Sequence, residues 1–420
     1  MTIEHFPPRG GIERVIAAVL RGMLKALLKP AFSARVPIPW QRRWLGVLSK
    51  LSLVPRGSVF EAATLGGVPG EWVRPALPPT RPGTLLYLHG GAYCIGAPAT
   101  HRALTARLAG ATGMAVFAAD YRLAPEHPFP AAVDDALAAY RALREHGPVV
   151  VGGDSAGGGL ALALAIALRD AGEPPPAALL LLSPWADMTM EGAPAHEPPG
   201  EAMLSVPWAN ACAQLCLRDT AATHPWASPL KADLRGLPPV LIQAGTDELL
   251  HDQAVQLHDA LQAAGVSVRC EITPQRWHVF QLHGGALASA DDAIARLALF
   301  ATTAHARDEA EQREVVILGA GMSGLCMSVQ LRRAGIADFV VIEQSAGLGG
   351  TWWDNRYPGA HVDVPAPLYS FSFAPNPRWT RRFAAAPEIQ AYMQDVAQRF
   401  GVMPHIRFGR CIVSAEFDEA

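Results

Sequence analysis

The chain has 420 residues, a length that corresponds to two or three domains. Half of the residues are hydrophobic, 17% are charged and the formal net charge is −3, as in a globular enzyme with ample core. This near balance of charge excludes a basic nucleic-acid-binding surface as the main feature of the chain. No apolar run reaches the roughly 18 residues that a transmembrane helix needs, and the N-terminus lacks a signal-peptide cleavage pattern.

The cysteines are scattered and form no Cys-x-x-Cys pair. They are Cys94, Cys212, Cys216, Cys270, Cys326 and Cys411. This spacing indicates neither a metal site nor a disulfide framework, and it favours a reducing cytoplasm.

One amphipathic helix is predicted near the N-terminus. Its apolar side chains recur at spacings of three and four, at Ile12, Val15, Ile16, Val19, Leu20, Met23, Leu24, Leu27 and Leu28. Basic residues lie among its polar positions, at Arg14, Arg21, Lys25 and Lys29. A basic amphipathic helix can make peripheral contact with an anionic membrane. The commoner arrangement, which we expect, packs the apolar face over the body of the enzyme.

From residue 84 onward, short apolar strands alternate with helices. The predicted strands are 85–88, 114–118, 149–151, 178–182 and 240–243, with helices at 131–144 and 158–171 among the segments between them. This alternation predicts an α/β fold with a parallel sheet covered on both faces. We expect a cap and lead-in over 1–80, a catalytic domain over 81–301, a polar linker over 302–313 and a second unit over 314–420.

The sharpest local signal is a nucleophile elbow. A strand runs into Gly153-Asp154-Ser155-Ala156-Gly157, and an apolar helix follows. The flanking glycines allow the tight turn that exposes the serine hydroxyl. The pattern predicts Ser155 as a catalytic nucleophile.

A second glycine-rich loop predicts an oxyanion hole. His89-Gly90-Gly91-Ala92 follows the strand 85–88, and glycine lets the backbone approach a substrate carbonyl. We expect the N–H groups of Gly90, Gly91 and Ala156 to be the donors. His89 is expected to shape the loop.

The acid and the base of a triad follow the serine in chain order in this type of fold. Asp247 lies just past the strand 240–243 and is the expected acid, with Glu248 and Asp252 as neighbours that resemble it. His278 lies on the loop after a strand-like stretch at 266–272 and is the expected base.

Taken together, these motifs resemble the bacterial hormone-sensitive-lipase family of α/β-hydrolases. The resemblance is strengthened by the stretch Asp120-Tyr-Arg-Leu-Ala-Pro-Glu-His-Pro-Phe-Pro130, and it spans residues 11–301. It implies a helical cap over the pocket and hydrolysis of carboxylic esters with short to medium acyl chains. Glu126 and His127 look structural in such proteins.

A nucleotide-binding pattern opens the second unit. The strand 315–318 leads into Gly319-Ala-Gly321-Met-Ser-Gly324, a helix follows, and the next strand ends at Glu343. This is the Gly-x-Gly-x-x-Gly context of a dinucleotide site, with a carboxylate at the distance suited to ribose hydroxyls. The pattern predicts a partial Rossmann-like βαβ unit.

The segment from Gly349 to Gly359 resembles the FAD-binding part of Baeyer–Villiger and related flavin monooxygenases. The resemblance places flavin contacts at Glu343, Thr351, Trp352, Asp363 and Tyr369. The chain departs from that family's pattern at Val362 and at Pro365-Ala366.

Residues 314–420 are too short for a complete monooxygenase, and no second glycine-rich motif for NADPH follows Tyr369. We therefore expect a serine esterase joined to the FAD-binding start of a monooxygenase. The alternative is a ketone monooxygenase in a longer chain, with the hydrolase as an accessory that cleaves its ester product. A non-catalytic hydrolase relative is disfavoured because all parts of the hydrolase motif set are present.

Overall fold

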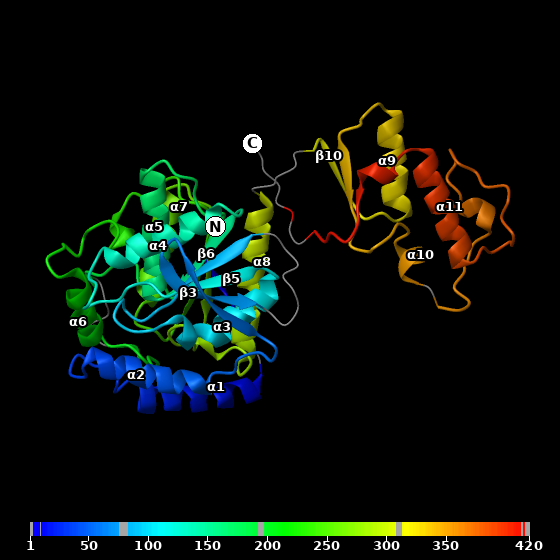
Figure 1. Cartoon of the computed structure of the whole chain (residues 1–420). Coiled ribbons are helices and arrows are strands. Elements are labelled where there is room, and N and C mark those ends of the chain that lie inside the picture. The colour runs from blue at the N-terminus through cyan, green and yellow to red at the C-terminus, as the bar shows by residue number, and fades with distance from the viewer. Residues whose placement is uncertain are drawn as a thin grey trace. The chain divides into compact units, whose positions relative to one another are not determined.

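The computed structural model describes residues 3–8, 10–74, 83–191, 197–307, 313–355, 357–412 and 415, with the side chains of 304–307 left out (Figure 1). Its contacts divide the chain into two compact units, Met1–Glu309 and Ala310–Ala420. The boundary expected near residue 80 within the first unit stays a prediction.

The first unit is built on one mixed sheet with the order β1-β9-β8-β7-β6-β4-β5-β3-β2 in its described part. Its strands are β1 (Glu4–His5), β2 (Val59–Leu65), β3 (Val68–Arg74), β4 (Thr84–Leu88), β5 (Ala115–Ala119), β6 (Val149–Asp154), β7 (Leu179–Leu182), β8 (Val240–Gly245) and β9 (Val268–Thr273). Neighbours from β1 to β5 along this order run parallel. The predicted α/β fold is confirmed.

Two antiparallel strands were not predicted. β2 pairs with β3, and β3 pairs antiparallel with β5, so part of the expected helical lead-in is a hairpin at the edge of the sheet. Gly66 and Gly67 join the two strands with φ values of 57° and 82°. Two consecutive left-handed residues form the tight turn that matches the twist of a hairpin.

Helices cover both faces of this sheet. They are α3 (Pro98–Thr112), α4 (Ala131–Arg144), α5 (Ala156–Asp170), α6 (Val206–Leu217), α7 (His251–Ala263) and α8 (Ala288–Arg307), with short 3-10 helices at Ser49–Leu51, Pro229–Lys231 and Phe280–His283. Alternate strand residues face two apolar cores, one shared with α4, α5 and α7, the other with α3 and α8. Every residue of α5 from Ala156 to Leu168 is buried, which explains its apolar sequence.

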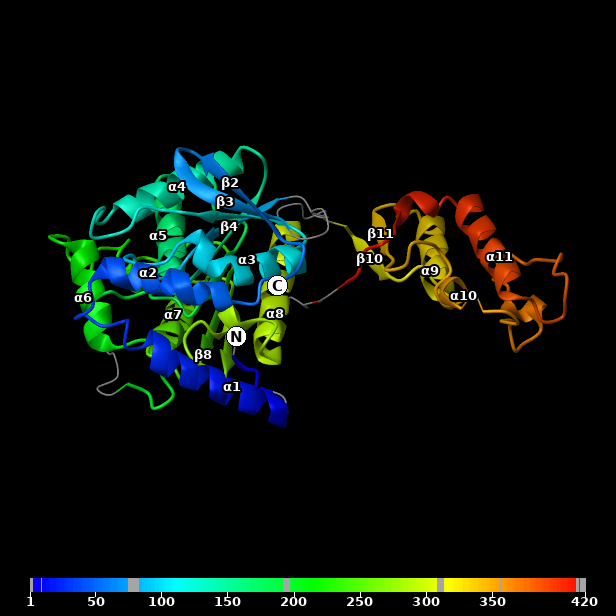
Figure 2. The ribbon, with the colours of Figure 1, turned by 60° about the horizontal axis from the view of Figure 1, so that its bottom comes forward.

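The N-terminal cap consists of α1 (Gly11–Met23), a π-helical turn (Leu24–Leu28) and α2 (Ile38–Leu48). Both helices lie across the same end of the first unit (Figures 1 and 2). The expected packing of the first helix holds for only part of its apolar face: Leu20, Leu24 and Leu28 pack on the core, whereas Ile12 is 80% and Val19 is 58% exposed. A polar contact also holds the helix to the body, since the buried Glu13 pairs with the buried Arg276 at 2.7 Å.

The second unit is a three-stranded parallel sheet, in the order β10-β11-β12, with helices. Its elements are β10 (Val315–Leu318), α9 (Met322–Arg333), β11 (Phe339–Ile342), α10 (Thr351–Asp354), a 3-10 turn (Ala366–Tyr369), α11 (Ala386–Arg399), a 3-10 turn (Met403–His405) and β12 (Ile406–Arg407). The predicted βαβ unit is confirmed.

Across the described ranges, no helix is both long enough and apolar enough to cross a membrane.

Candidate active site

Ser155 lies at the sharp turn between β6 and α5. Its backbone has φ 53° and ψ −120°, a conformation that a non-glycine residue adopts only under constraint. Its N–H donates to the Leu182 carbonyl at 2.8 Å, and its carbonyl accepts from Trp185 at 2.9 Å. A Cβ at Gly157 would overlap the Leu88 carbonyl, so the close approach of α5 to β4 requires glycine there. The elbow has the predicted form.

His278 follows β9 and is fully buried, with its Nδ1 2.9 Å from Oε2 of Glu248. The Glu248 side chain is also fully buried, and its other oxygen accepts from the Gly245 N–H at 3.1 Å. The imidazole therefore has a fixed carboxylate partner on Nδ1, which leaves Nε2 for proton transfer.

The acid expected from the sequence, Asp247, does not contact His278. Its carboxylate lies 2.9 Å from Arg21 of the cap and is about a quarter exposed, while its backbone N–H donates to the Arg276 carbonyl at 2.9 Å. Asp247 thus contacts Arg21 of the cap, while the next side chain, Glu248, contacts His278. The other neighbour, Asp252, is exposed on α7.

The charge around His278 favours its protonated form. Burial alone lowers the pKa of His278, but the hydrogen bond to Glu248 and its negative charge raise it, and the charges of Glu201 and Asp154 add to that effect. The net pKa lies above the ordinary value for histidine. Such an environment stabilises the imidazolium that forms when the histidine takes a proton.

Glu201 is a buried acid that the sequence analysis missed. One oxygen accepts from the N–H groups of Met203 and Leu204, at 2.7 and 2.9 Å, and the other accepts from Leu249 at 2.7 Å. Because Leu249 directly follows Glu248, Glu201 holds the backbone that carries the partner of His278. Its position in a proline-rich loop offered no sequence signal.

The oxyanion loop differs from the expectation at Gly90. The Gly90 N–H donates to Asp154 at 3.0 Å, and the same carboxylate accepts from Tyr87 at 2.7 Å and lies 3.3 Å from His101. The Gly90 N–H therefore already has an acceptor and is not available to an oxyanion. The next two residues, Gly91 and Ala92, have φ values of 123° and 52°.

Three backbone N–H groups near the elbow remain available. Within the described parts of the chain, no acceptor is found for the amides of Gly91, Ala92 and Ala156. Ala156 is the first residue of α5, where the helix dipole favours negative charge. The amides of Gly91 and Ala156, which the sequence predicts as oxyanion donors, are thus free to donate, as is the amide of Ala92.

His89 has a structural environment. Its ring stacks on Tyr121 with centroids 4.4 Å apart, and the Tyr121 hydroxyl donates to the His89 carbonyl at 2.6 Å. Burial, with the charge of His101, lowers the pKa of His89 to about 4. The ring stays neutral at neutral pH and shapes the loop.

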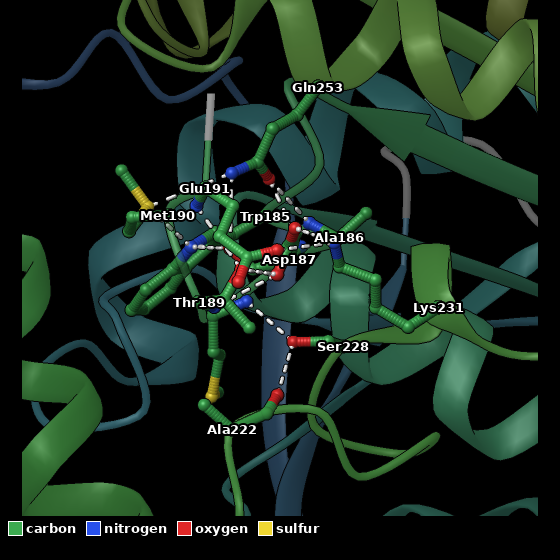
Figure 3. A network of polar contacts seen from close by, with 11 residues as sticks. Trp185, Ala186, Asp187, Thr189, Met190, Glu191, Ala222, Ser228, Lys231 and Gln253 are labelled. Atoms are coloured by element: carbon green, nitrogen blue, oxygen red, sulfur yellow. Dashed lines mark hydrogen bonds and ion pairs between the residues drawn. The ribbon is translucent and has the colours of Figure 1, made fainter. Parts of the chain in front are cut away.

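The loop after β7, which contacts the elbow through Trp185, is held by a network of polar contacts (Figure 3). Gln253 accepts from the N–H groups of Ala186 and Asp187, both at 3.1 Å, and donates to the Asp187 carbonyl at 3.1 Å. The buried Asp187 carboxylate caps this loop by accepting from the Thr189 hydroxyl at 2.6 Å. Trp185, which binds the Ser155 carbonyl, is thereby held in place.

In the second unit, Glu343 directly follows β11, and its carboxylate is buried against the glycine-rich loop. It accepts from the Ala320 N–H at 2.6 Å and from the Ser345 N–H at 2.7 Å. A Cβ at Gly324 would overlap the Gly319 carbonyl, so glycine is required where α9 packs on the loop. The N-terminus of α9 and the loop amides form the cradle that a dinucleotide pyrophosphate needs.

Of the other residues expected to contact the flavin, some lie close to one another in the structure and one does not. Gly350 packs against Gly321, which brings α10 with Thr351 and Trp352 to the loop. The Trp352 indole donates to the Tyr369 hydroxyl at 3.0 Å. Asp363 is exposed.

Comparisons with known proteins agree with this geometry. Residues 85–282 match the alpha/beta hydrolase fold family, and residues 317–386 match the NAD(P)-binding Rossmann-like domain family. An acetyl-hydrolase of Streptomyces hygroscopicus is 47% identical over 60% of this chain and 84% of its own length. An esterase of Acinetobacter venetianus is 36% identical over 57% of this chain and 80% of its own length.

The first unit is also similar to solved structures of esterases. A crystal structure of an esterase from the bacterial hormone-sensitive lipase family is 36% identical, covers 71% of this chain and 99% of its own, and has a TM-score of 0.63. The chain therefore belongs to the α/β-hydrolase family that includes the bacterial hormone-sensitive-lipase esterases. Its first unit is a carboxylesterase-type hydrolase.

The second unit has its own relatives. A Baeyer-Villiger monooxygenase of Streptomyces coelicolor is 54% identical over 98 residues, which are 23% of this chain and 19% of that protein. The chain thus spans about a fifth of this relative. The likeness supports a flavin or nicotinamide cofactor at the Rossmann-like fold.

Proposed function

We propose that the first unit hydrolyses carboxylic esters with Ser155 as nucleophile, His278 as base and Glu248 as the acid that orients it. The observation that carries this proposal is the buried 2.9 Å contact between His278 and Glu248 in a unit that also holds a strained serine elbow. A buried imidazole with a carboxylate on Nδ1 has the arrangement that activates a hydroxyl nucleophile.

The proposed reaction runs in two halves. His278 Nε2 takes the hydroxyl proton as Ser155 Oγ attacks the ester carbonyl carbon, and the N–H groups of Gly91, Ala92 and Ala156 stabilise the oxyanion. The intermediate collapses as His278 returns the proton to the leaving alcohol, which leaves an acyl-serine. Water, deprotonated by His278, then releases the carboxylic acid and restores Ser155.

Short to medium acyl esters are the proposed substrates. An acetyl-hydrolase of Streptomyces hygroscopicus and a putative acetyl-hydrolase of Mycobacterium tuberculosis, 38% identical over 92% of its own length, are relatives that support this choice. The six cysteines are all free, which supports action in the reducing cytoplasm.

The test is the variant Ser155→Ala, assayed on p-nitrophenyl butyrate. Removing the nucleophile of a triad costs about 10⁴-fold or more in kcat, so hydrolysis should fall to background. A serine-reactive phosphonate should label the wild-type chain and leave the variant unlabelled. Wild-type turnover in the variant, with an unchanged circular dichroism spectrum, would contradict the assignment.

For the second unit we propose binding of FAD. Gly319, Gly321 and the N-terminus of α9 would hold the pyrophosphate, and Glu343 would bind the ribose hydroxyls. Thr351, Trp352, Asp363 and Tyr369 are the proposed contacts nearer the flavin, which supplies redox chemistry when bound. Purified chain incubated with FAD and then gel-filtered should retain flavin absorbance; a colourless chain would refute this binding.

A second candidate function couples the two units. The similarity to a Baeyer-Villiger monooxygenase supports a sequence in which a ketone, O₂, NADPH and a proton give an ester, water and NADP⁺, and the first unit then hydrolyses the ester. Ketone-dependent oxidation of NADPH by the chain would support this function. A chain that hydrolyses esters and oxidises no NADPH would confine activity to the first unit.

A further inference from the structure

The N-terminal cap presents two apolar stripes to the outside. On α1 and the turn after it the exposed side chains are Ile12, Val15, Ile16, Val19, Met23 and Leu27; on α2 and the segment after it they are Trp40, Trp44, Val47, Leu51, Leu53 and Val54. We call these side chains together the cap face. The Trp44 indole donates to the Leu27 carbonyl at 2.8 Å, which joins the two stripes. Monomeric proteins rarely expose so large an apolar area without a partner for it.

Buried polar contacts hold α1 in this orientation. Glu13 accepts from Arg276 at 2.7 Å and from the Ser289 N–H at 2.9 Å, all inside the first unit. Turning the helix to bury its apolar stripe would expose Glu13 and leave the buried Arg276 unpaired, which is strongly unfavourable. The outward direction of the stripe is therefore a feature of the folded unit.

The second helix is held in the same way. Gln41 is buried and accepts from the Trp208 indole N–H of α6 at 2.9 Å. Arg42 donates to the Cys94 carbonyl at 2.8 Å and pairs with Glu126 at 2.7 Å. Polar residues again face the body while Trp40, 63% exposed, faces away.

The charge of the cap selects the partner. The first 60 residues contain ten Lys and Arg and only two Glu, and Glu13, one of these, is buried against Arg276. The exposed cations include Arg14, Arg35, Arg43, Lys50 and Arg56. A second copy of the chain would bring the same positive charge against itself. An anionic surface that also accepts apolar side chains is complementary on both counts.

We propose that the cap face binds the surface of an anionic lipid bilayer, with its apolar side chains in the interface and its cations at the headgroups. Tryptophan is well suited to this depth because its ring is apolar and its N–H is polar. Since Arg21 of α1 donates to the carbonyl of Gln275, three residues before His278, at 2.8 Å, the bound cap lies next to the catalytic loop. This inference goes beyond the proposed function and is tested by binding.

The experiment is flotation of the full chain with vesicles of phosphatidylcholine containing 30% phosphatidylglycerol, and with phosphatidylcholine alone. We expect wild type to float with the anionic vesicles and to dissociate as salt is raised, because the headgroup contacts are screened. Val15→Glu with Val19→Glu should weaken binding at least tenfold. Absence of wild-type binding at low salt would overturn the proposal.

A matched control carries the same kind of change elsewhere on the first unit. Val59→Glu with Leu299→Glu alters apolar side chains that are 47% and 43% exposed on β2 and α8, and it should float as wild type does. Both double variants should keep wild-type hydrolysis of a soluble butyrate ester, which shows that they fold. An equal loss of vesicle binding in both double variants would overturn the proposal in favour of a general effect of the added charge. A wild-type chain that binds no vesicles but forms a dimer, which the cap variant alone makes monomeric, would overturn it in favour of a second copy of the chain.

Discussion

The two units assemble their candidate sites in different ways. In the first, Ala92, Ser155, Glu248 and His278 come from loops that are far apart in sequence, and Glu13 adds a contact from the N-terminus. In the second, the glycine-rich loop and Glu343 belong to one β10-α9-β11 segment. The difference teaches that a contiguous motif carries its own geometry, whereas a site built from distant loops depends on how each turn is directed.

The largest expected effect tests the direction of one such turn. Glu248→Gln should lower kcat/KM by about 10³- to 10⁴-fold, as loss of a triad carboxylate does, because the amide no longer stabilises the imidazolium. Asp247→Asn should cost less than about tenfold, since Asp247 faces Arg21. Steady-state hydrolysis of p-nitrophenyl butyrate measures both. A greater loss from Asp247→Asn would restore the assignment suggested by the sequence.

The next effect concerns stability. Glu13→Ala should lower the free energy of unfolding by about 3 kcal/mol, because it leaves Arg276 charged and buried without its partner. Arg21→Ala on the same helix is the matched control and should cost less than about 1 kcal/mol, since its pair with Asp247 is partly exposed. Urea unfolding followed by circular dichroism and residual ester hydrolysis compares them. Equal losses would show that the buried pair does not anchor the cap.

A smaller effect sharpens the contrast between the units. Gly324→Ala should weaken FAD retention at least tenfold, because the added Cβ overlaps the Gly319 carbonyl and displaces α9. Ester hydrolysis should not change. Met327→Ala, at an exposed position of the same helix, should retain flavin as wild type does. Flavin absorbance after gel filtration measures retention, and a fully yellow Gly324→Ala chain would contradict the site.

The pH profile tests the electrostatics of His278. The base must be neutral to act, so activity falls below the pKa of His278, which Glu248 and Glu201 raise. In Glu248→Gln the acidic limb of kcat/KM should therefore move to lower pH, and in Glu201→Gln it should move the same way by less. A limb that moves to higher pH in either variant would contradict the proposed arrangement.

The smallest expected effect lies in the oxyanion loop. Ala92 has a φ of 52°, which glycine adopts more readily than alanine, so Ala92→Gly should raise the free energy of unfolding by up to about 1 kcal/mol. Ala18→Gly, at an exposed position of α1, should lower it by about 0.5–1 kcal/mol. Thermal unfolding curves measure both. A destabilised Ala92→Gly variant would indicate that the left-handed conformation carries no strain.

Much of the fold followed from local pattern. The parallel strands from β4 to β9 and the sharp turn at Ser155 between β6 and α5 follow the predicted pattern, because period, glycine spacing and strand ends are local properties. The role of His278 as base stays a prediction. The hairpin β2-β3 was missed because its partner strand β5 lies some forty residues away. The exposed face of α1 was missed because an amphipathic pattern does not say which side has the better partner.

The sequence by itself determined the class of each unit and predicted the nucleophile, the base and the nucleotide-binding loop, since each rests on a short motif. Only the tertiary structure favours Glu248 over Asp247 as the proposed acid and Ala92 over Gly90 as a proposed oxyanion donor, and only it shows which face of α1 is exposed. In each case a polar partner that is distant in the sequence is involved. For Asp247 the partners are Arg21 and the Arg276 carbonyl, and for the Gly90 N–H the partner is Asp154. For α1 it is again Arg276, which pairs with Glu13. Satisfying buried charges and backbone donors outweighs local pattern, because an unpaired polar group in the interior is so costly.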